Sequence, residues 1–97
     1  FSRIAQLRSQ SQLLEVECAA NASIPAEQKN AIAKIKNDLR YLSPANSAEA
    51  FDYEAQMVES LSALRSLCKQ GASADEIQNA INAFAGLLQA RKLIYKN

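Results

Sequence analysis

The two cysteines are the residues whose type and placement first suggest chemistry. Cys18 and Cys68 are the only cysteines among 97 residues, and the chain has no histidine and no tryptophan. A cysteine near the end of a helix can fill the core, join a disulfide or act as a nucleophile. A nucleophilic cysteine needs a nearby base or cation that favours its thiolate. Because the sequence offers no evident base beside either cysteine, we expect neither to be catalytic.

The absence of histidine excludes several kinds of active site. A Ser-His-Asp or Cys-His centre cannot be built from this chain alone. The Glu-x-x-His pairs of di-iron bundles are missing too, and two cysteines cannot complete a four-ligand zinc site. The two glycines, Gly71 and Gly86, stand apart and form no phosphate-binding loop. We therefore expect no enzyme activity, no cofactor and no resident metal ion.

Acidic residues gather near the beginning of the third predicted helix. Glu49, Asp52 and Glu54 lie there, and Glu59 follows. Such a group can bind a cation or exchange protons, or it can complement the positive end of the helix dipole from a solvated face. Asp52 and Glu59 fall beside the apolar stripe of this helix rather than within it. We therefore interpret the group as a solvated helix N-terminus without a metal-binding or catalytic role.

Four amphipathic helices would position these side chains. They are predicted at about residues 2–20, 25–42, 47–70 and 74–95, because apolar residues recur there at every third or fourth position. The predicted core stripes contain Ile4, Leu7, Ser11, Leu14, Cys18, Ile32, Ile35, Leu39, Leu42, Ala50, Met57, Val58, Leu61, Leu64, Cys68, Ile77, Ile81, Phe84, Leu88 and Tyr95. The sequence therefore predicts an all-α protein.

Local signals mark the breaks between these helices. Gly71 is predicted to end the third helix in the left-handed conformation. Asn46 with Glu49, and Ser73 with Glu76, have the spacing of capping boxes at helix N-termini. Short breaks favour antiparallel neighbours, so we expect a four-helix up-down-up-down bundle as a single domain over residues 1–97. The alternative is a three-helix core with the first helix packed obliquely or swapped onto a partner chain.

The positions of Cys18 and Cys68 favour a disulfide that a regular bundle would oppose. Each lies on a core stripe near the end of its helix, and alternating helices bring both ends to one pole. The disulfide would close a loop of about 50 residues. In a regular bundle, however, the first and third helices are diagonal, which tends to keep their Cα atoms beyond the roughly 7 Å limit for a disulfide. The disulfide therefore requires a bundle that tapers at this pole, or one in which the first and third helices are neighbours. The alternative is that both cysteines are buried free thiols.

Composition limits the partners. The net charge is +1 with 48% hydrophobic and 22% charged residues, which is typical of a globular domain and lacks the basic excess of a nucleic-acid-binding protein. No apolar run approaches the roughly 18 residues of a membrane span. The first residue is Phe1 rather than methionine, so we expect that a preceding segment was removed. A disulfide would favour an extracytoplasmic (periplasmic or secreted) location over a cytoplasmic one.

Three apolar residues fall away from the predicted core. Leu13 and Val16 point roughly opposite to the stripe of the first helix, when each residue advances about 100°. Leu67 lies to one side of the third helix at the same pole. These residues form a partner patch, or else the first helix is buried on both faces. In the first case a protein partner or a second copy would bind there.

Two functions fit these observations. The first is a small non-catalytic helical interaction domain of adaptor, assembly or inhibitor type, which the missing chemistry and the patch of Leu13, Val16 and Leu67 favour. The alternative is an extracytoplasmic sensor or ligand-binding bundle of a membrane-anchored protein, which Cys18 and Cys68 favour. An apolar stretch of about 20 residues before Phe1 would favour the sensor.

Overall fold

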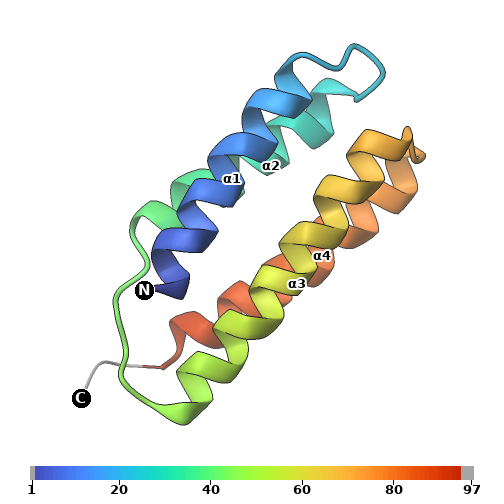
Figure 1. The fold of residues 1–97 in the computed structure, drawn as a ribbon. Helices are drawn as coiled ribbons and strands as arrows, with labels where there is room; N and C mark the ends of the chain where they lie inside the picture. The colour runs from blue at the N-terminus through green and yellow to red at the C-terminus, as the bar shows by residue number, and fades with distance from the viewer. Residues whose placement is uncertain (1, 95–97) are drawn as a thin grey trace.

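The computed structural model describes residues 2–94, which fold into four α-helices (Figure 1). Their bounds are α1 (Arg3–Ala19), α2 (Ala26–Arg40), α3 (Ala48–Gln70) and α4 (Ala74–Lys92). No strand occurs within these residues, so the predicted all-α, four-helix fold is confirmed. The predicted end of the last helix at Tyr95 lies outside the described residues.

Serine hydroxyls begin three of the helices. Ser2, Ser47 and Ser73 each accept a hydrogen bond from the backbone N–H three residues later, which satisfies one free donor of the first turn. The predicted capping box of Ser73 is confirmed, because the Glu76 carboxylate accepts from the Ser73 N–H. The predicted box at Asn46 is wrong, since the N-cap of α3 is Ser47, one residue later.

Gly71 ends α3 in the left-handed conformation, as the sequence predicts. Its φ is 73°, a region that side chains disfavour. The Gly71 N–H donates to the Cys68 carbonyl and the Ala72 N–H to the Leu67 carbonyl, which satisfies two of the free acceptors at the helix end. This compact stop lets α4 begin at Ala74 and turn back along α3.

The helices form two hairpins that lie side by side (Figure 1). The first hairpin pairs α1 with α2, and the second pairs α3 with α4; between the hairpins α1 contacts α3, and α2 contacts α4. Within the described helices, the backbones of α1 and α4 stay more than 8 Å apart across the core, as do those of α2 and α3. The first and third helices are therefore neighbours, and the diagonal placement expected for a regular bundle is wrong. Because α1 packs along α2 and α3 of its own chain, the alternative of an oblique or swapped first helix does not describe this structure.

Contacts at the two ends of the seam between α1 and α3 show that these helices run in the same direction. Ile4 and Glu54 line one groove near their N-terminal ends, and Cys18 meets Cys68 near their C-terminal ends. The link from α2 to α3, residues 41–47, consequently crosses the bundle diagonally (Figure 1). The short breaks predicted antiparallel neighbours, and they did not predict that α1 and α3 pack side by side in parallel.

The core runs the length of a rod of 43 × 20 × 19 Å. Buried positions are spaced by three and four residues in every helix, which is the pattern of helices packed along one another. The predicted stripes are confirmed, except that Val58 is only partly buried and Tyr95 is not described. The buried apolar residues are Ile4, Leu7, Leu14, Cys18, Ile24, Ile32, Ile35, Leu39, Leu42, Ala45, Ala50, Met57, Leu61, Leu64, Cys68, Ile77, Ile81, Phe84 and Leu88.

The rod has two different ends. We call the end that carries the α1–α2 and α3–α4 turns, residues 20–25 and 71–73, the thiol pole, because both cysteines lie there. We call the opposite end, which carries residues 41–47, the crossover pole. The candidate functional residues fall at these two poles and on the outer face of α1.

Candidate functional site

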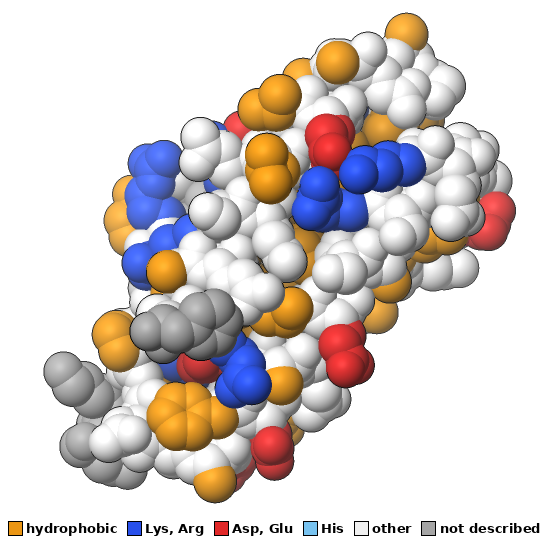
Figure 2. All heavy atoms as spheres, in the orientation of Figure 1, with side chains coloured by type: hydrophobic (Ala, Val, Ile, Leu, Met, Phe, Trp, Pro, Cys, Tyr) orange, Lys and Arg blue, Asp and Glu red, His pale blue; other side chains and the backbone are white. Residues whose placement is uncertain are grey.

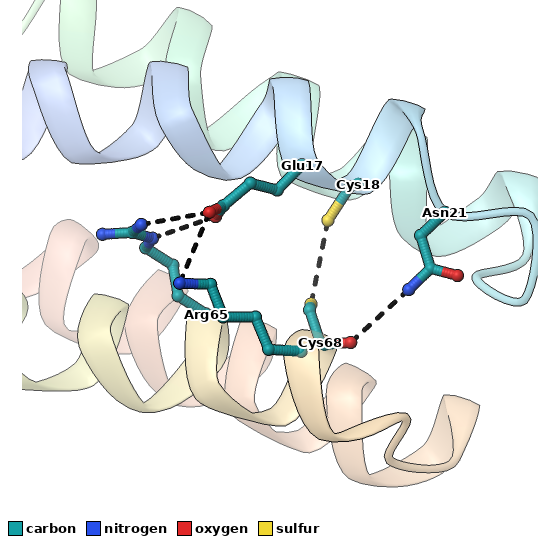
Figure 3. A network of polar contacts seen from close by, with 6 residues as sticks. Glu17, Cys18, Asn21, Arg65 and Cys68 are labelled. Atoms are coloured by element: carbon teal, nitrogen blue, oxygen red, sulfur yellow. Dashed lines mark hydrogen bonds and ion pairs between the residues drawn. The ribbon is translucent and has the colours of Figure 1, made fainter.

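Cys18 and Cys68 meet in the seam between α1 and α3 at the thiol pole (Figure 3). Their Sγ atoms are 3.7 Å apart, and both side chains are buried. The sulfurs are free thiols, so the predicted disulfide is not formed in this structure. The pairing of the two residues in space is nevertheless the one expected, and the condition that their helices be neighbours is met.

Burial keeps both cysteines in the thiol form. Desolvation, with the neighbouring Cys68, raises the pKa of Cys18 from 9.0 to about 12. Burial also raises the pKa of Cys68, although the S–H that Cys18 donates acts in the opposite direction by stabilising a Cys68 thiolate. Glu17 raises both pKa values and Lys29 lowers that of Cys18. A reactive nucleophile needs a lowered pKa, so neither cysteine has the environment of one.

Polar contacts surround the two sulfurs. The Glu17 carboxylate accepts hydrogen bonds from Arg65 Nε and Nη2 at 3.1 and 3.2 Å, and Lys69 Nζ lies 3.5 Å away. The pKa of Glu17 is lowered, first by the hydrogen bond from Arg65. The Asn21 amide donates to the Cys68 carbonyl at 3.5 Å. Figure 3 shows these contacts on both sides of the sulfurs, and Figure 2 shows acidic and basic side chains touching between the two hairpins.

A buried ion pair lies at the crossover pole. Arg91 Nε donates to Glu54 Oε2 at 2.8 Å, and the two side chains are only 1% and 5% exposed. Arg91 Nη2 also donates to the carbonyl of Ser43 at 2.8 Å, which attaches α4 to residues 41–47, the crossover segment. The interpretation of Glu54 as part of a solvated acidic group is therefore wrong. Its side chain occupies the same stripe as Ala50 and Met57, so α3 turns it toward the core.

Arg8 ties α1 to the end of α2. Its Nε donates to the Leu39 carbonyl at 3.0 Å, and its Nη2 donates to the Arg40 and Leu42 carbonyls at 3.1 and 3.3 Å. Carbonyls at a helix C-terminus lack partners within the helix and carry partial negative charge. Sequence reasoning missed this contact, because nothing in the segment around Arg8 indicates which helix end lies beside it.

Two cavities flank Pro44 at the crossover pole. One has a volume of about 690 Å³ and is lined by Tyr41, Ser43, Arg91 and Lys92 among others. The other has a volume of about 370 Å³, and Glu54 lines it. Large apolar side chains are exposed in the same region, namely Tyr41, Phe51 and Leu93.

The outer face of α1 carries exposed apolar side chains. Leu13 is 52% and Val16 is 62% exposed, so each points away from the core as predicted. Leu67 is partly buried and packs against the core, so it contributes less to a surface than the sequence suggested. Three charged side chains of α1 turn sideways to neighbouring helices: Arg8 to α2, Glu15 to Lys36 on α2 at 2.9 Å, and Glu17 to α3.

The described residues show neither a metal-binding cluster nor a membrane span. Within residues 2–94, no group of three or more histidine, cysteine, aspartate or glutamate side chains lies close enough to hold a metal ion. None of the four helices combines the length and the apolarity needed to cross a membrane.

Comparison of the chain with protein-family models, with curated proteins and with solved structures finds no significant match. The function is therefore argued from the residues and their geometry.

Proposed function

We propose that this chain is a small non-catalytic helical interaction domain, of adaptor, assembly or inhibitor type, which binds a protein surface through the outer face of α1. The observation that carries the proposal is the exposure of Leu13 and Val16, at 52% and 62%. They are three residues apart, so both project from one side of the helix. Exposed apolar pairs of this kind are the anchors by which helices bind one another.

The residues around this pair support the proposal. Advancing about 100° per residue, the exposed outer face of α1 contains Ala5, Ser9, Gln12, Leu13 and Val16, none of which is charged. A partner that covers this face would leave no charge unpaired, and burial of an unpaired charge is the main cost of a helix contact.

A second copy of the chain is the occupant that this face favours. A two-fold interface places one surface against itself, so a charged residue near the axis would meet a like charge. The uncharged face of α1 avoids this conflict, because Arg8, Glu15 and Glu17 are engaged at its edges.

The test replaces the two anchors and leaves the fold intact. In Leu13→Gln/Val16→Gln, self-association measured by analytical ultracentrifugation is expected to weaken at least tenfold, with an unchanged circular dichroism melting curve. The matched control is Ala63→Gln/Ser66→Gln, an exposed pair with the same spacing on α3, which should associate like the wild type. A wild-type protein that stays monomeric at millimolar concentration would contradict the second copy as occupant, and unfolding of the variant would show that Leu13 and Val16 belong to the core.

The second candidate function is an extracytoplasmic sensor or ligand-binding bundle. The cavity of about 690 Å³ beside Tyr41, Ser43 and Lys92 favours it, since ligand sites are concave surfaces of roughly this size. Lys92, which lines this cavity, would suit an anionic ligand. Titration with inorganic phosphate should then shift the amide resonances of residues 41–43 in wild type and not in Lys92→Ala. Absence of any shift would count against an anion site.

A further inference from the structure

The two hairpins are linked covalently at the crossover pole only. Residues 41–47 connect α2 to α3 there, whereas each hairpin closes on itself at the thiol pole. The buried pair of Glu54 and Arg91, with the Arg91 bond to the Ser43 carbonyl, also holds α3, α4 and the crossover segment together. The molecule therefore has the geometry of a hinge, with residues 41–47 at the closed end and the thiol pole at the open end.

The polar contacts that close the thiol pole are modest. Glu17 pairs with Arg65 and Lys69 across the seam, and its side chain is one-third exposed. Ion pairs in contact with solvent add little to stability. The Gln28 side-chain amide donates to Gln78 Oε1 at 3.0 Å between α2 and α4, and these two helices share the least extensive of the four helix contacts. On the seam between α1 and α3, the two sulfurs lie between the Glu17 contacts and the bond from Asn21 (Figure 3).

The geometry of the two thiols suits a covalent bond. A disulfide requires the sulfurs to come about 1.7 Å closer than their present 3.7 Å. Both side chains start from parallel neighbouring helices and point toward each other (Figure 3). Cys18 also lines a groove of about 300 Å³, open to solvent and bordered by Val16, Ala19 and Lys29. Cys18 itself is only 2% exposed, so a small reagent that enters this groove between α1 and α2 reaches its sulfur when the thiol pole opens.

We propose that Cys18 and Cys68 form a reversible disulfide that locks α1 to α3 at the thiol pole, and that the reduced pair leaves this pole able to open. The lock does not depend on the interaction function proposed above, since it concerns the seam within one chain and not the outer face of α1.

The oxidant we name is a small-molecule disulfide such as oxidised glutathione. When the thiol pole opens, Cys18 meets solvent and ionises, and its thiolate attacks one sulfur of this disulfide. A mixed disulfide forms, and one small thiolate leaves and takes up a proton. The Cys68 thiolate then attacks Cys18 Sγ and displaces the second small thiolate. The two protein thiols lose two electrons and two protons, and the small disulfide is reduced to two thiols. Excess small thiol reverses both steps.

The first test follows the chemistry on the folded protein. Reduced wild type is incubated with oxidised glutathione without denaturant, and its mass and peptide map are recorded without reduction. The expected product is a monomer lighter by two hydrogen atoms, in which the peptides of Cys18 and Cys68 are joined. Cys18→Ala and Cys68→Ala are matched controls that should lack this product. A covalent dimer, or a mixed disulfide that never resolves, would overturn the proposal.

The second test asks whether the bond acts as a lock. Closing a loop of about 50 residues lowers the unfolding equilibrium constant roughly a thousandfold in the chain-entropy model, so the urea midpoint should rise on oxidation. Amide hydrogen exchange under native conditions should slow at least tenfold in residues 19–25 and 69–73, and change much less in residues 41–47. Equal slowing at both poles, or none at the thiol pole, would show that no separate opening exists there and would overturn the lock.

Discussion

The two poles hold the same four helices together by different means. At the crossover pole, Glu54 and Arg91 form a fully buried ion pair that also binds the Ser43 carbonyl. At the thiol pole, the charged contacts of Glu17 are partly exposed and the buried groups are two neutral thiols. The charged groups at one end of the rod therefore have no access to water, whereas those at the other end are weakened by it.

The two poles therefore differ in how strictly they determine the alignment of the helices. A buried charge is costly unless its partner is in place, so the crossover pole tolerates one alignment of α3, α4 and residues 41–47. The thiol pole has no such requirement, because a thiol that loses its neighbour remains an acceptable small apolar group. The comparison predicts that substitutions at the crossover pole are severe and that those at the thiol pole are mild.

Removal of Glu54 should have the largest effect. Glu54→Ala leaves Arg91 buried without its carboxylate, which should cost about 3–5 kcal/mol in the free energy of unfolding. Urea denaturation followed by circular dichroism measures this loss. Replacing both partners, as in Glu54→Leu/Arg91→Met, should recover most of it, because the penalty comes from the unpaired charge. A mild effect of Glu54→Ala would refute the claimed difference between the poles.

The raised thiol pKa values predict a pH dependence at the other pole. At about pH 8, Cys18 in the reduced native protein should react with iodoacetamide roughly a thousandfold more slowly than a thiol of ordinary pKa, given its shift from 9.0 to about 12. Mass spectrometry of timed samples measures the rate. Alkylation of Cys18 at the rate of an unfolded peptide would contradict the burial of this sulfur.

The raised thiol pKa values also determine how the free energy of unfolding changes with pH. Below about pH 9 both the folded and the unfolded chain hold protonated thiols, so the buried thiols make their full contribution to the free energy of unfolding. Above that pH the unfolded thiols ionise, while native Cys18 keeps its proton to about 12, and stability falls as the pH rises. Cys18→Ala should flatten this decline in urea titrations over the same pH range.

Arg8 should have an intermediate effect. Arg8→Ala removes the donors of three carbonyls at the end of α2, which should cost about 1–2 kcal/mol in unfolding free energy. Arg8→Lys should restore only part of this, because an ammonium group cannot reproduce the planar arrangement of donors. Arg3→Ala, at an exposed position of the same helix, is the control and should be nearly neutral in urea denaturation.

Glu17 should have the smallest effect. Glu17→Gln weakens the contacts with Arg65 and Lys69, which should cost less than about 1 kcal/mol because the pair is exposed to solvent. The loss should shrink further at high salt, whereas that of Glu54→Ala should not. A salt-independent loss as large as that of Glu54→Ala would mean that both poles are fixed in the same way.

The sequence was sufficient to predict most of the apolar side chains that are buried in each helix, and also the meeting of Cys18 with Cys68. Glu54 and Arg91 were missed because their charge was given more weight than their position. Both continue the core spacing of their helices, after Ala50 and after Leu88. They are also about equally distant along the chain from the turn at residues 71–73. An antiparallel hairpin brings such positions together, so this signal would have paired them.

The choice of neighbours could not be predicted from the sequence. Apolar stripes specify that each helix faces a core, and they are compatible with α3 beside α1 or diagonal to it. The contacts that decide between the two, such as Glu17 with Arg65 and Gln28 with Gln78, join surfaces whose proximity becomes evident only in three dimensions. The same limit made the disulfide geometry look unfavourable for Cys18.

The length of the diagonal link has a consequence for the topology of the chain. Seven extended residues, 41–47, reach about 23 Å, whereas neighbouring helix axes are 8–10 Å apart and diagonal ones about 11–14 Å. The present link can therefore span either placement. A link shortened to two residues makes three Cα–Cα steps between the helix ends, would reach only about 10 Å and would force α3 into the place beside α2. That permuted bundle would keep every apolar stripe, yet it would separate the two sulfurs across the diagonal. A link long enough to cross the bundle is therefore a condition for the meeting of Cys18 with Cys68.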